Sequence, residues 1–96
     1  MLDSNQLNQI RNIVHPLLPD NSYKVFVFGS RATGNNRPFS DVDIGILGNK
    51  ILPSEKYIKM TESFENSDLP FKVDVVDFML VTDRFKKQAL THIIDI

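Results

Sequence analysis

Two aspartates separated by a single residue, Asp41 and Asp43, are the side chains in this sequence best suited to hold a cation. In a β-strand, residues two apart point to the same face, and each residue advances the chain by ~3.3 Å. The two carboxylates would then lie side by side, with Cα atoms ~6.5 Å apart. Carboxylates this close repel each other unless a cation lies between them, and Mg²⁺ prefers such ligands together with waters and phosphates. The pair therefore predicts a magnesium site.

A third acid could complete a site for two metal ions. Asp74 lies in the middle of another β-branched segment, residues 72–78, and Asp77 follows it closely. The two have opposite strand parity, so they cannot both face the same site. Three carboxylates around two ions suit phosphoryl and nucleotidyl transfer. One ion lowers the pKa of the attacking hydroxyl, and the other neutralises charge on the triphosphate and its leaving group.

Gly29 and Ser30 come directly after an apolar segment, ten residues before Asp41, and could hold a phosphate. Glycine lets a backbone approach closely, and the Ser30 hydroxyl can donate a hydrogen bond. Arg31 and Arg37 lie in the same loop and can pair with phosphate oxygens. Taken alone, Gly-Ser is an ordinary strand-ending turn, and the arginines could be plain surface charges.

The elements that must position these residues can be read from hydrophobic periodicity. Apolar steps of three and four predict a helix from Asp3 or Ser4 to about Leu17, another from Ser54 to about Phe64, and a last helix after Thr82. The middle helix would bury Tyr57, Ile58, Thr61 and Phe64, and the last one Phe85, Ala89, Leu90 and Ile93. Strands are expected at residues 24–28, 41–47 and 72–78, with Phe26 and Phe28 in the core, and a helical turn near Arg31. The order predicts an α/β (α+β) fold, a small mixed sheet of about three strands with helices packed against it.

Bulk properties narrow the class further. The 96 residues predict a single domain over 1–96, and the formal net charge of −1 gives no reason to expect nucleic acid as a partner. There is no cysteine, which excludes disulfides and thiolate metal sites. No apolar stretch approaches a signal peptide or a membrane span, so we expect a cytoplasmic protein. A domain this small is also expected to gain stability from a partner subunit, a second copy included. His15 and His92 are isolated and are expected to be structural or solvated.

Gly29-Ser30, ten residues and then Asp41-Val42-Asp43 resembles the defining motif of the polymerase-beta-like nucleotidyltransferase superfamily. The longer runs 28–34 and 37–43 resemble its minimal, single-domain branch, and residues 68–78 continue the match. One departure is Thr33, where the branch often has a second arginine. The resemblance covers roughly residues 25–78, and the two terminal helices match only in kind.

The resemblance implies a role for each matched residue. Asp41 and Asp43 would bind both Mg²⁺ ions, and Asp74 would bind the catalytic ion and activate the acceptor hydroxyl. With the three-strand arrangement, this favours Asp74 over Asp77, which is left as a loop or cap residue. Gly29 and Ser30 would hold the β- and γ-phosphates of ATP. Arg31 and Ser40 would support the loop, and Arg37 remains a candidate phosphate ligand.

The resemblance also implies an activity and a partner. It implies transfer of AMP from ATP to an acceptor hydroxyl, with a protein hydroxyl such as a tyrosine expected. Because a chain of this length has no room to enclose an acceptor, a helical partner is expected to complete the cleft: a HEPN-like toxin or a substrate-binding subunit. Two alternatives remain. The domain could be a non-catalytic nucleotide- or metal-binding antitoxin or regulatory subunit that acts by complex formation, or an aminoglycoside-type small-molecule transferase.

Overall fold

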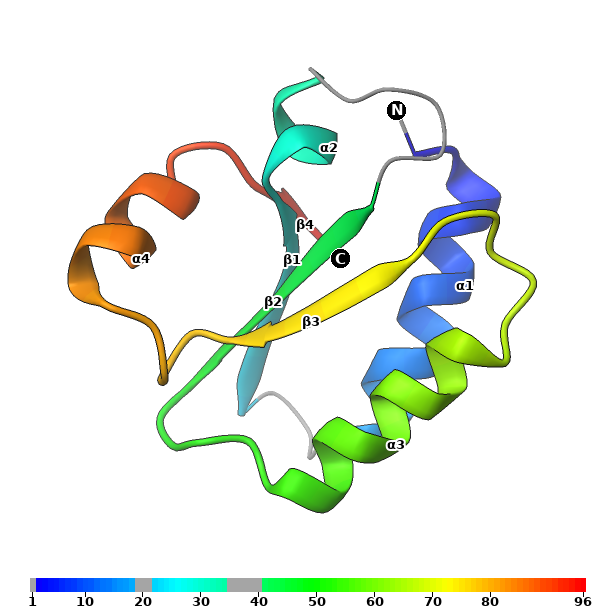
Figure 1. The fold of residues 1–96 in the computed structure, drawn as a ribbon, viewed down its shortest axis with the longest axis horizontal. Helices are drawn as coiled ribbons and strands as arrows, with labels where there is room; N and C mark the ends of the chain where they lie inside the picture. The colour runs from blue at the N-terminus through cyan, green and yellow to red at the C-terminus, as the bar shows by residue number, and fades with distance from the viewer. Residues whose placement is uncertain (1, 19–21, 35–40) are drawn as a thin grey trace.

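The computed structural model describes residues 2–18, 22–34 and 41–96. Within these ranges it forms one four-stranded sheet with helices on both faces (Figure 1). In chain order the elements are α1 (Ser4–Val14), the 3-10 helix η1 (His15–Leu17), β1 (Tyr23–Phe28), α2 (Ser30–Thr33), β2 (Val42–Gly48), α3 (Ser54–Glu65), β3 (Val73–Asp77), α4 (Asp83–Ala89) and β4 (Ile94–Asp95). The predicted fold class, a small mixed sheet with packed helices, is confirmed.

The strand order is β3-β2-β1-β4. The central strand β1 pairs antiparallel with both β2 and β4, whereas β2 and β3 are parallel. The prediction of about three strands missed β4, and it was wrong to extend the last helix to Ile93, because α4 ends at Ala89. Two residues are too few to show a strand period in the sequence. Ile94 and Asp95 are extended because they pair with Val27 and Phe26 across the sheet.

The helix starts follow local capping chemistry. Asp3 caps α1, accepting a hydrogen bond from the Gln6 backbone N–H at 2.8 Å, and the Gln6 side chain accepts in return from the Asp3 N–H. Thr82 caps α4 as predicted, accepting from the Phe85 N–H at 3.2 Å. The helix α3 begins at Ser54, as predicted, and its N-cap position is Pro53, which provides no side-chain capping hydrogen bond.

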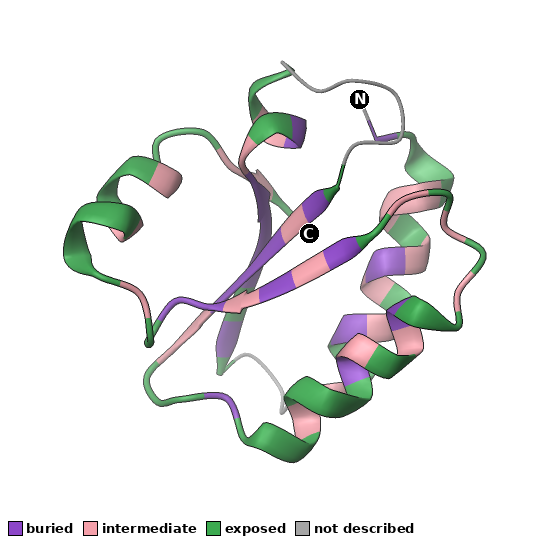
Figure 2. Ribbon diagram, viewed as in Figure 1, coloured by how far each residue is buried: buried purple, intermediate pink, exposed green. Residues whose placement is uncertain are grey.

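One face of the sheet packs against α1 and α3 and forms an aliphatic core (Figure 1, Figure 2). Ile44 and Ile46 of β2 are fully buried in it, as are Ile10 and Val14 of α1. From α3 the buried residues are Met60 and Phe64, whereas Tyr57 and Ile58 are exposed, so the predicted inner face of this helix was partly wrong. The side of α3 that faces α1 and the sheet carries Met60, whereas Tyr57 and Ile58 lie on the side that faces solvent.

The opposite face carries an aromatic cluster made by Phe26, Phe28 and Phe78. Phe26 and Phe78 meet edge to face with ring centroids 4.9 Å apart, and Phe28 and Phe78 do so at 5.1 Å. Gly45 makes room for these rings, since a Cβ there would lie 2.3 Å from Phe26 and 2.8 Å from Phe78. Phe26 and Phe28 are therefore core residues, as predicted. None of the helices in the described ranges is long and apolar enough to cross a membrane.

Candidate active site

The register of the sheet places the predicted carboxylates on the aromatic face. Asp43 of β2 pairs with Phe28 on β1 and with Asp74 on β3. Because directly paired residues point to the same side of a sheet, Asp43 and Asp74 project together, just beyond the end of the aromatic cluster. Asp41 is exposed one residue before β2 begins, and it is close enough to act electrostatically on Asp43. The structure thus brings together the three acids that the sequence singled out.

The electrostatic environment of Asp43 is unfavourable to its charge. Partial burial raises the pKa of this carboxyl above its ordinary value, and the negative charges of Asp74 and then Asp41 raise the pKa further. A cation placed among the three would reverse this balance, because it favours the ionised form of each. A positive charge bound here would therefore stabilise the ionised form of Asp43.

A lysine already lies at the edge of this acidic group. Lys72 stands two residues before Asp74, and its Nζ lies 3.6 Å from Asp74 Oδ1. Both side chains are well exposed, so the pair contributes little to stability. The sequence reasoning missed Lys72, although its position two residues before a singled-out acid was a usable signal.

No group of three or more His, Cys, Asp or Glu side chains in the described ranges is arranged to hold a metal ion by itself. Mg²⁺ usually takes one or two protein carboxylates and completes its shell with waters and substrate phosphates. The neighbouring carboxylates of Asp43 and Asp74 fit that requirement, with Asp41 nearby. Metal binding by Asp41, Asp43 and Asp74 stays a prediction, and the donor chemistry is consistent with it.

The Gly29 turn lies directly against the Asp43 carboxylate. Gly29 has φ 74° and ψ −151°, a conformation that essentially only glycine adopts. An added Cβ would also lie 2.6 Å from Asp43 Oδ2, so the side chain must be absent on both counts. The turn leads into α2, whose first residue, Ser30, is exposed. Gly29 of the predicted phosphate-binding pair therefore lies beside Asp43, and phosphate binding by Gly29 and Ser30 stays a prediction.

The other predicted loop residues have different outcomes. The structure buries Arg31, with its guanidinium stacked 4.9 Å from the centre of the Phe71 ring. This cation–π contact joins α2 to the segment before β3, which agrees with a supporting role for Arg31 in the loop. Its predicted phosphate contact remains a prediction. Arg37 and Ser40 lie outside the described residues.

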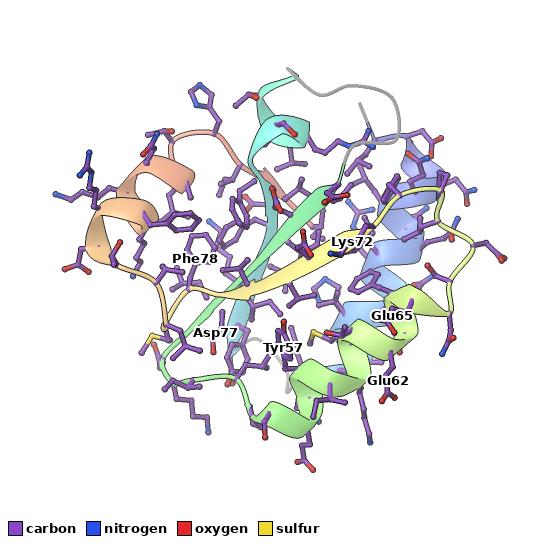
Figure 3. All side chains as sticks on the ribbon, in the orientation of Figure 1. Tyr57, Glu62, Glu65, Lys72, Asp77 and Phe78 are labelled. Atoms are coloured by element: carbon purple, nitrogen blue, oxygen red, sulfur yellow. The ribbon has the colours of Figure 1, made fainter. Side chains whose placement is uncertain are left out.

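Asp77 is separated from the site by the sheet, as its strand parity predicted. It is buried near the end of β3, next to Phe78 (Figure 3). Its carboxylate accepts hydrogen bonds from the backbone N–H of Leu52 at 2.7 Å and of Met79 at 2.9 Å. It therefore holds two backbone segments in place in the manner of a cap residue, although Asp77 is the last residue of β3 and not a loop residue.

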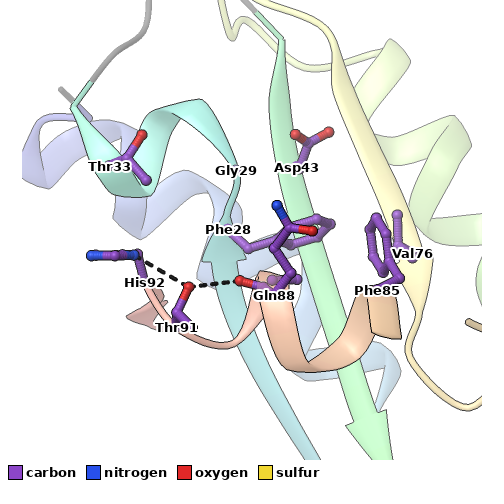
Figure 4. A pocket seen from close by; sticks show the side chains of 10 residues that line it. Phe28, Gly29, Thr33, Asp43, Val76, Phe85, Gln88, Thr91 and His92 are labelled. Atoms are coloured by element: carbon purple, nitrogen blue, oxygen red, sulfur yellow. Dashed lines mark hydrogen bonds between the residues drawn. The ribbon is translucent and has the colours of Figure 1, made fainter. Parts of the chain in front are cut away.

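A cleft of about 630 Å³ opens from Asp43 and Gly29 toward α4. Figure 4 shows Asp43 and the Gly29 turn at one end and side chains from α4 and the turn after it at the other. The α4 side contributes Phe85, Gln88, Thr91 and His92. This wall was not predicted from the sequence, and His92 was expected to be structural or solvated. Phe85 was predicted to be buried on the inner side of the last helix, but it is exposed, and only the tertiary fold places it in one cleft with Asp43.

Comparison with known proteins shows which family the chain belongs to. The family model described as "Polymerase beta, Nucleotidyltransferase" matches residues 8–96. The chain belongs to this nucleotidyltransferase family. The match confirms the resemblance carried by the Gly-Ser and Asp-Val-Asp motif.

Relatives of the family agree with this assignment. The chain is 33% identical over 86 residues to a protein of Haemophilus influenzae named "Probable protein adenylyltransferase MntA", covering 90% of this chain and 74% of that protein. It also resembles the crystal structure of a toxin–antitoxin with AMP-PNP, at TM-score 0.73 and 24% identity, covering 92% of this chain and 69% of the other. A second likeness, at TM-score 0.66 and 22% identity, is to a tri-AMPylated Shewanella oneidensis HEPN toxin in complex with MNT antitoxin, covering 94% and 69%. At these identities the structural likenesses establish the shared fold.

Proposed function

We propose that this nucleotidyltransferase moves AMP from ATP to a hydroxyl group on a helical partner protein in the cytoplasm. The observation that carries the proposal is the contact zone of Gly29, Asp43 and Asp74. A glycine turn suited to phosphate lies against the Asp43 carboxylate, and Asp43 pairs across the sheet with Asp74, a second carboxylate suited to Mg²⁺. The family match supplies the reaction class.

In the proposed step, the acceptor oxygen attacks the α-phosphorus of ATP. The bond from that phosphorus to the oxygen bridging to the β-phosphate breaks, and pyrophosphate leaves with the bonding electrons. Asp74 takes the proton of the acceptor hydroxyl, so the products are the AMP ester and pyrophosphate. Two Mg²⁺ ions, when bound by Asp41, Asp43 and Asp74, would lower the pKa of the hydroxyl and offset charge on the leaving group.

The turn holds the donor in place for this attack. The backbone of Gly29 can approach the β- and γ-phosphates without steric hindrance, and Ser30 can donate its hydroxyl to them. Arg31, stacked on Phe71, keeps the turn in position from behind. We assign Arg37 and Ser40 to the same loop as further phosphate and loop-supporting residues.

The partner is proposed from the relatives. One is named a probable protein adenylyltransferase, and another was crystallised as an antitoxin with an AMPylated HEPN toxin. We therefore propose a HEPN-like helical protein as acceptor, modified and silenced by AMP transfer. A tyrosine hydroxyl is the proposed acceptor, because an exposed side-chain hydroxyl can reach the cleft without unfolding the partner.

The test is incubation with α-labelled ATP and Mg²⁺, with and without the partner, followed by a gel and intact mass. An AMP-sized mass increase on the partner is expected. Asp43→Asn should lower the rate by at least about a hundredfold, since metal-assisted stabilisation is worth several kcal/mol. Asp95→Asn is the matched control: it removes an exposed carboxylate from the same face, at the opposite edge, where it only pairs with Lys24.

Other outcomes would favour a different function. A tight complex that survives chelation, with no label on any component, would contradict the transferase proposal. It would instead support a binding module that neutralises its partner by occlusion. Full activity of Asp43→Asn would contradict the two-metal mechanism while leaving transfer itself intact.

A further inference from the structure

The α4 side of the cleft differs chemically from the end that holds Asp43 and Gly29. Its apolar lining comes from Phe28, Val76, Phe85 and Ala89, and the polar side chains that border it are Gln88, Thr91 and His92. None of the described residues that line the cleft is a lysine or an arginine. A phosphate would be poorly held there, because it needs cations or many N–H donors. This end of the cleft suits an uncharged, flat group.

Phe85 is the aromatic side chain best placed to meet such a group. It belongs to α4, and 43% of its surface is exposed although it is large and apolar. Its ring packs edge to face on Phe28, with centroids 6.0 Å apart and planes at 88°. The Phe28 side is anchored in the buried cluster, so Phe85 is held in position while part of its surface remains open.

Gln88 supplies a polar edge beside this aromatic wall. It lies one turn after Phe85 on α4 and lines the same cleft, with its side chain extending from the helix toward the Asp43 end (Figure 4). Among the described residues its side-chain amide has no hydrogen-bond partner, although its backbone carbonyl accepts from Thr91 at 2.6 Å. An amide offers one donor and one acceptor side by side.

We propose that the α4 end of the cleft is a nucleobase subsite, in which Phe85 stacks on adenine and Gln88 reads its hydrogen-bonding edge. This rests on the proposed function, which puts the triphosphate at the Gly29 end. An amide complements the adjacent acceptor and donor of adenine, whereas guanine is usually read by arginine or lysine. The cleft volume of about 630 Å³ is within the usual range for small-ligand sites, ~300–1,000 Å³.

The test separates the base from the phosphates by equilibrium binding to the whole chain with Mg²⁺. The probes are ATP, GTP and inorganic tripolyphosphate, which carries the phosphates without a base. Wild type should bind ATP at least about tenfold more tightly than tripolyphosphate, since stacking on one aromatic side chain accounts for such a factor. ATP should also bind more tightly than GTP.

The variants assign this difference to α4. Phe85→Ala should weaken ATP binding about tenfold and leave tripolyphosphate binding unchanged. Gln88→Leu should reduce the preference for ATP over GTP. Lys87→Ala, exposed on the same helix and absent from the cleft, should change none of these affinities. Phe85→Leu keeps an apolar side chain but has no ring to stack. If it melts at the same temperature as wild type and still binds ATP more weakly, the loss is due to stacking and not to unfolding.

Three results would overturn the inference. Equal binding of ATP and tripolyphosphate to wild type would show that the base stays outside the cleft, while the proposed transfer could still occur. Unchanged ATP binding in Phe85→Ala, together with weaker labelling of the partner, would assign the cleft to the acceptor side chain. Failure of wild type to bind ATP at all would contradict both this inference and the proposed function.

Discussion

The two faces of the sheet are built by the same strands and do different work. On the face covered by α1 and α3, Val42, Ile44 and Ile46 of β2 are fully buried among aliphatic side chains. On the other face, Asp43 of the same strand lies partly open beside Asp74. Each residue of β2 therefore belongs to one face or the other, and strand alternation separates the core from the chemistry.

The difference shows how so small a domain can carry an unfavourable acidic site. The aliphatic face supplies the burial that a stable fold requires, so the open face can hold carboxylates whose mutual repulsion opposes folding. The open face is itself partly buried, because it also carries the aromatic cluster, which borders the cleft at Phe28. Substitutions on the two faces should therefore affect stability and activity separately.

The largest expected effect comes from the covered face. Ile44→Ala should lower the free energy of unfolding by about 2–5 kcal/mol, because a fully buried side chain leaves a cavity. For a domain of this size that is a large fraction of its stability. Urea unfolding would measure the loss. The adjacent Asp43→Asn should keep the fold, so equal losses in the two variants would contradict the division between faces.

Much of this division could be predicted from the sequence. The opposite parity of Asp74 and Asp77 follows from the two-residue strand period, and the structure keeps this relation. Asp41 lies one residue before β2 and acts electrostatically on Asp43, as its closeness in the sequence predicted. The Gly29 turn was also predictable, because glycine followed by serine ends an apolar strand segment. Local patterns were sufficient wherever the relevant neighbours were close in the chain.

What could not be predicted depends on contacts distant in sequence. The strand β4 pairs with β1 through Ile94 and Val27, and the buried Arg31 lies over the ring of Phe71, forty residues later in the chain. The cleft wall at Phe85 forms only when α4 folds back over the acidic face. In each case the residue type alone fits several surroundings, and tertiary packing selects among them.

An intermediate effect should appear where the open face meets the turn. Gly29→Ala should cost about 1–3 kcal/mol of stability from its backbone conformation, and it should also displace the Asp43 carboxylate. Gly34→Ala is the matched control: Gly34 also has positive φ, 81°, but its Cβ would meet nothing within 4 Å. Both should lower the melting temperature, and only Gly29→Ala should also abolish AMP transfer. Equal loss of transfer in the two would contradict a specific role for the turn.

The smallest expected effect has the opposite sign: Asp43→Asn should make the protein more stable at pH 7. Below the unfolded-state pKa of about 3.9, Asp43 is protonated in both states, so its charge costs nothing. Its pKa in the folded protein is raised by burial and by Asp74 and Asp41, so stability is lost as the pH rises through that folded pKa. Asparagine carries no charge, so Asp43→Asn removes this loss of stability at pH 7. In acid, where Asp43 is protonated in wild type, the substitution should not have this effect.

Melting curves of the two proteins between pH 3 and pH 8 would measure this effect. The curves should converge in acid and separate toward neutral pH, with Asp95→Asn showing no such separation, because Asp95 is an exposed residue paired with Lys24. Mg²⁺ should raise the melting temperature of wild type at pH 7 more than that of Asp43→Asn, since a bound cation offsets the same repulsion. A variant less stable than wild type at pH 7 would mean that Asp43 stabilises the fold. The open face would then contribute to the stability of the fold, as the covered face does.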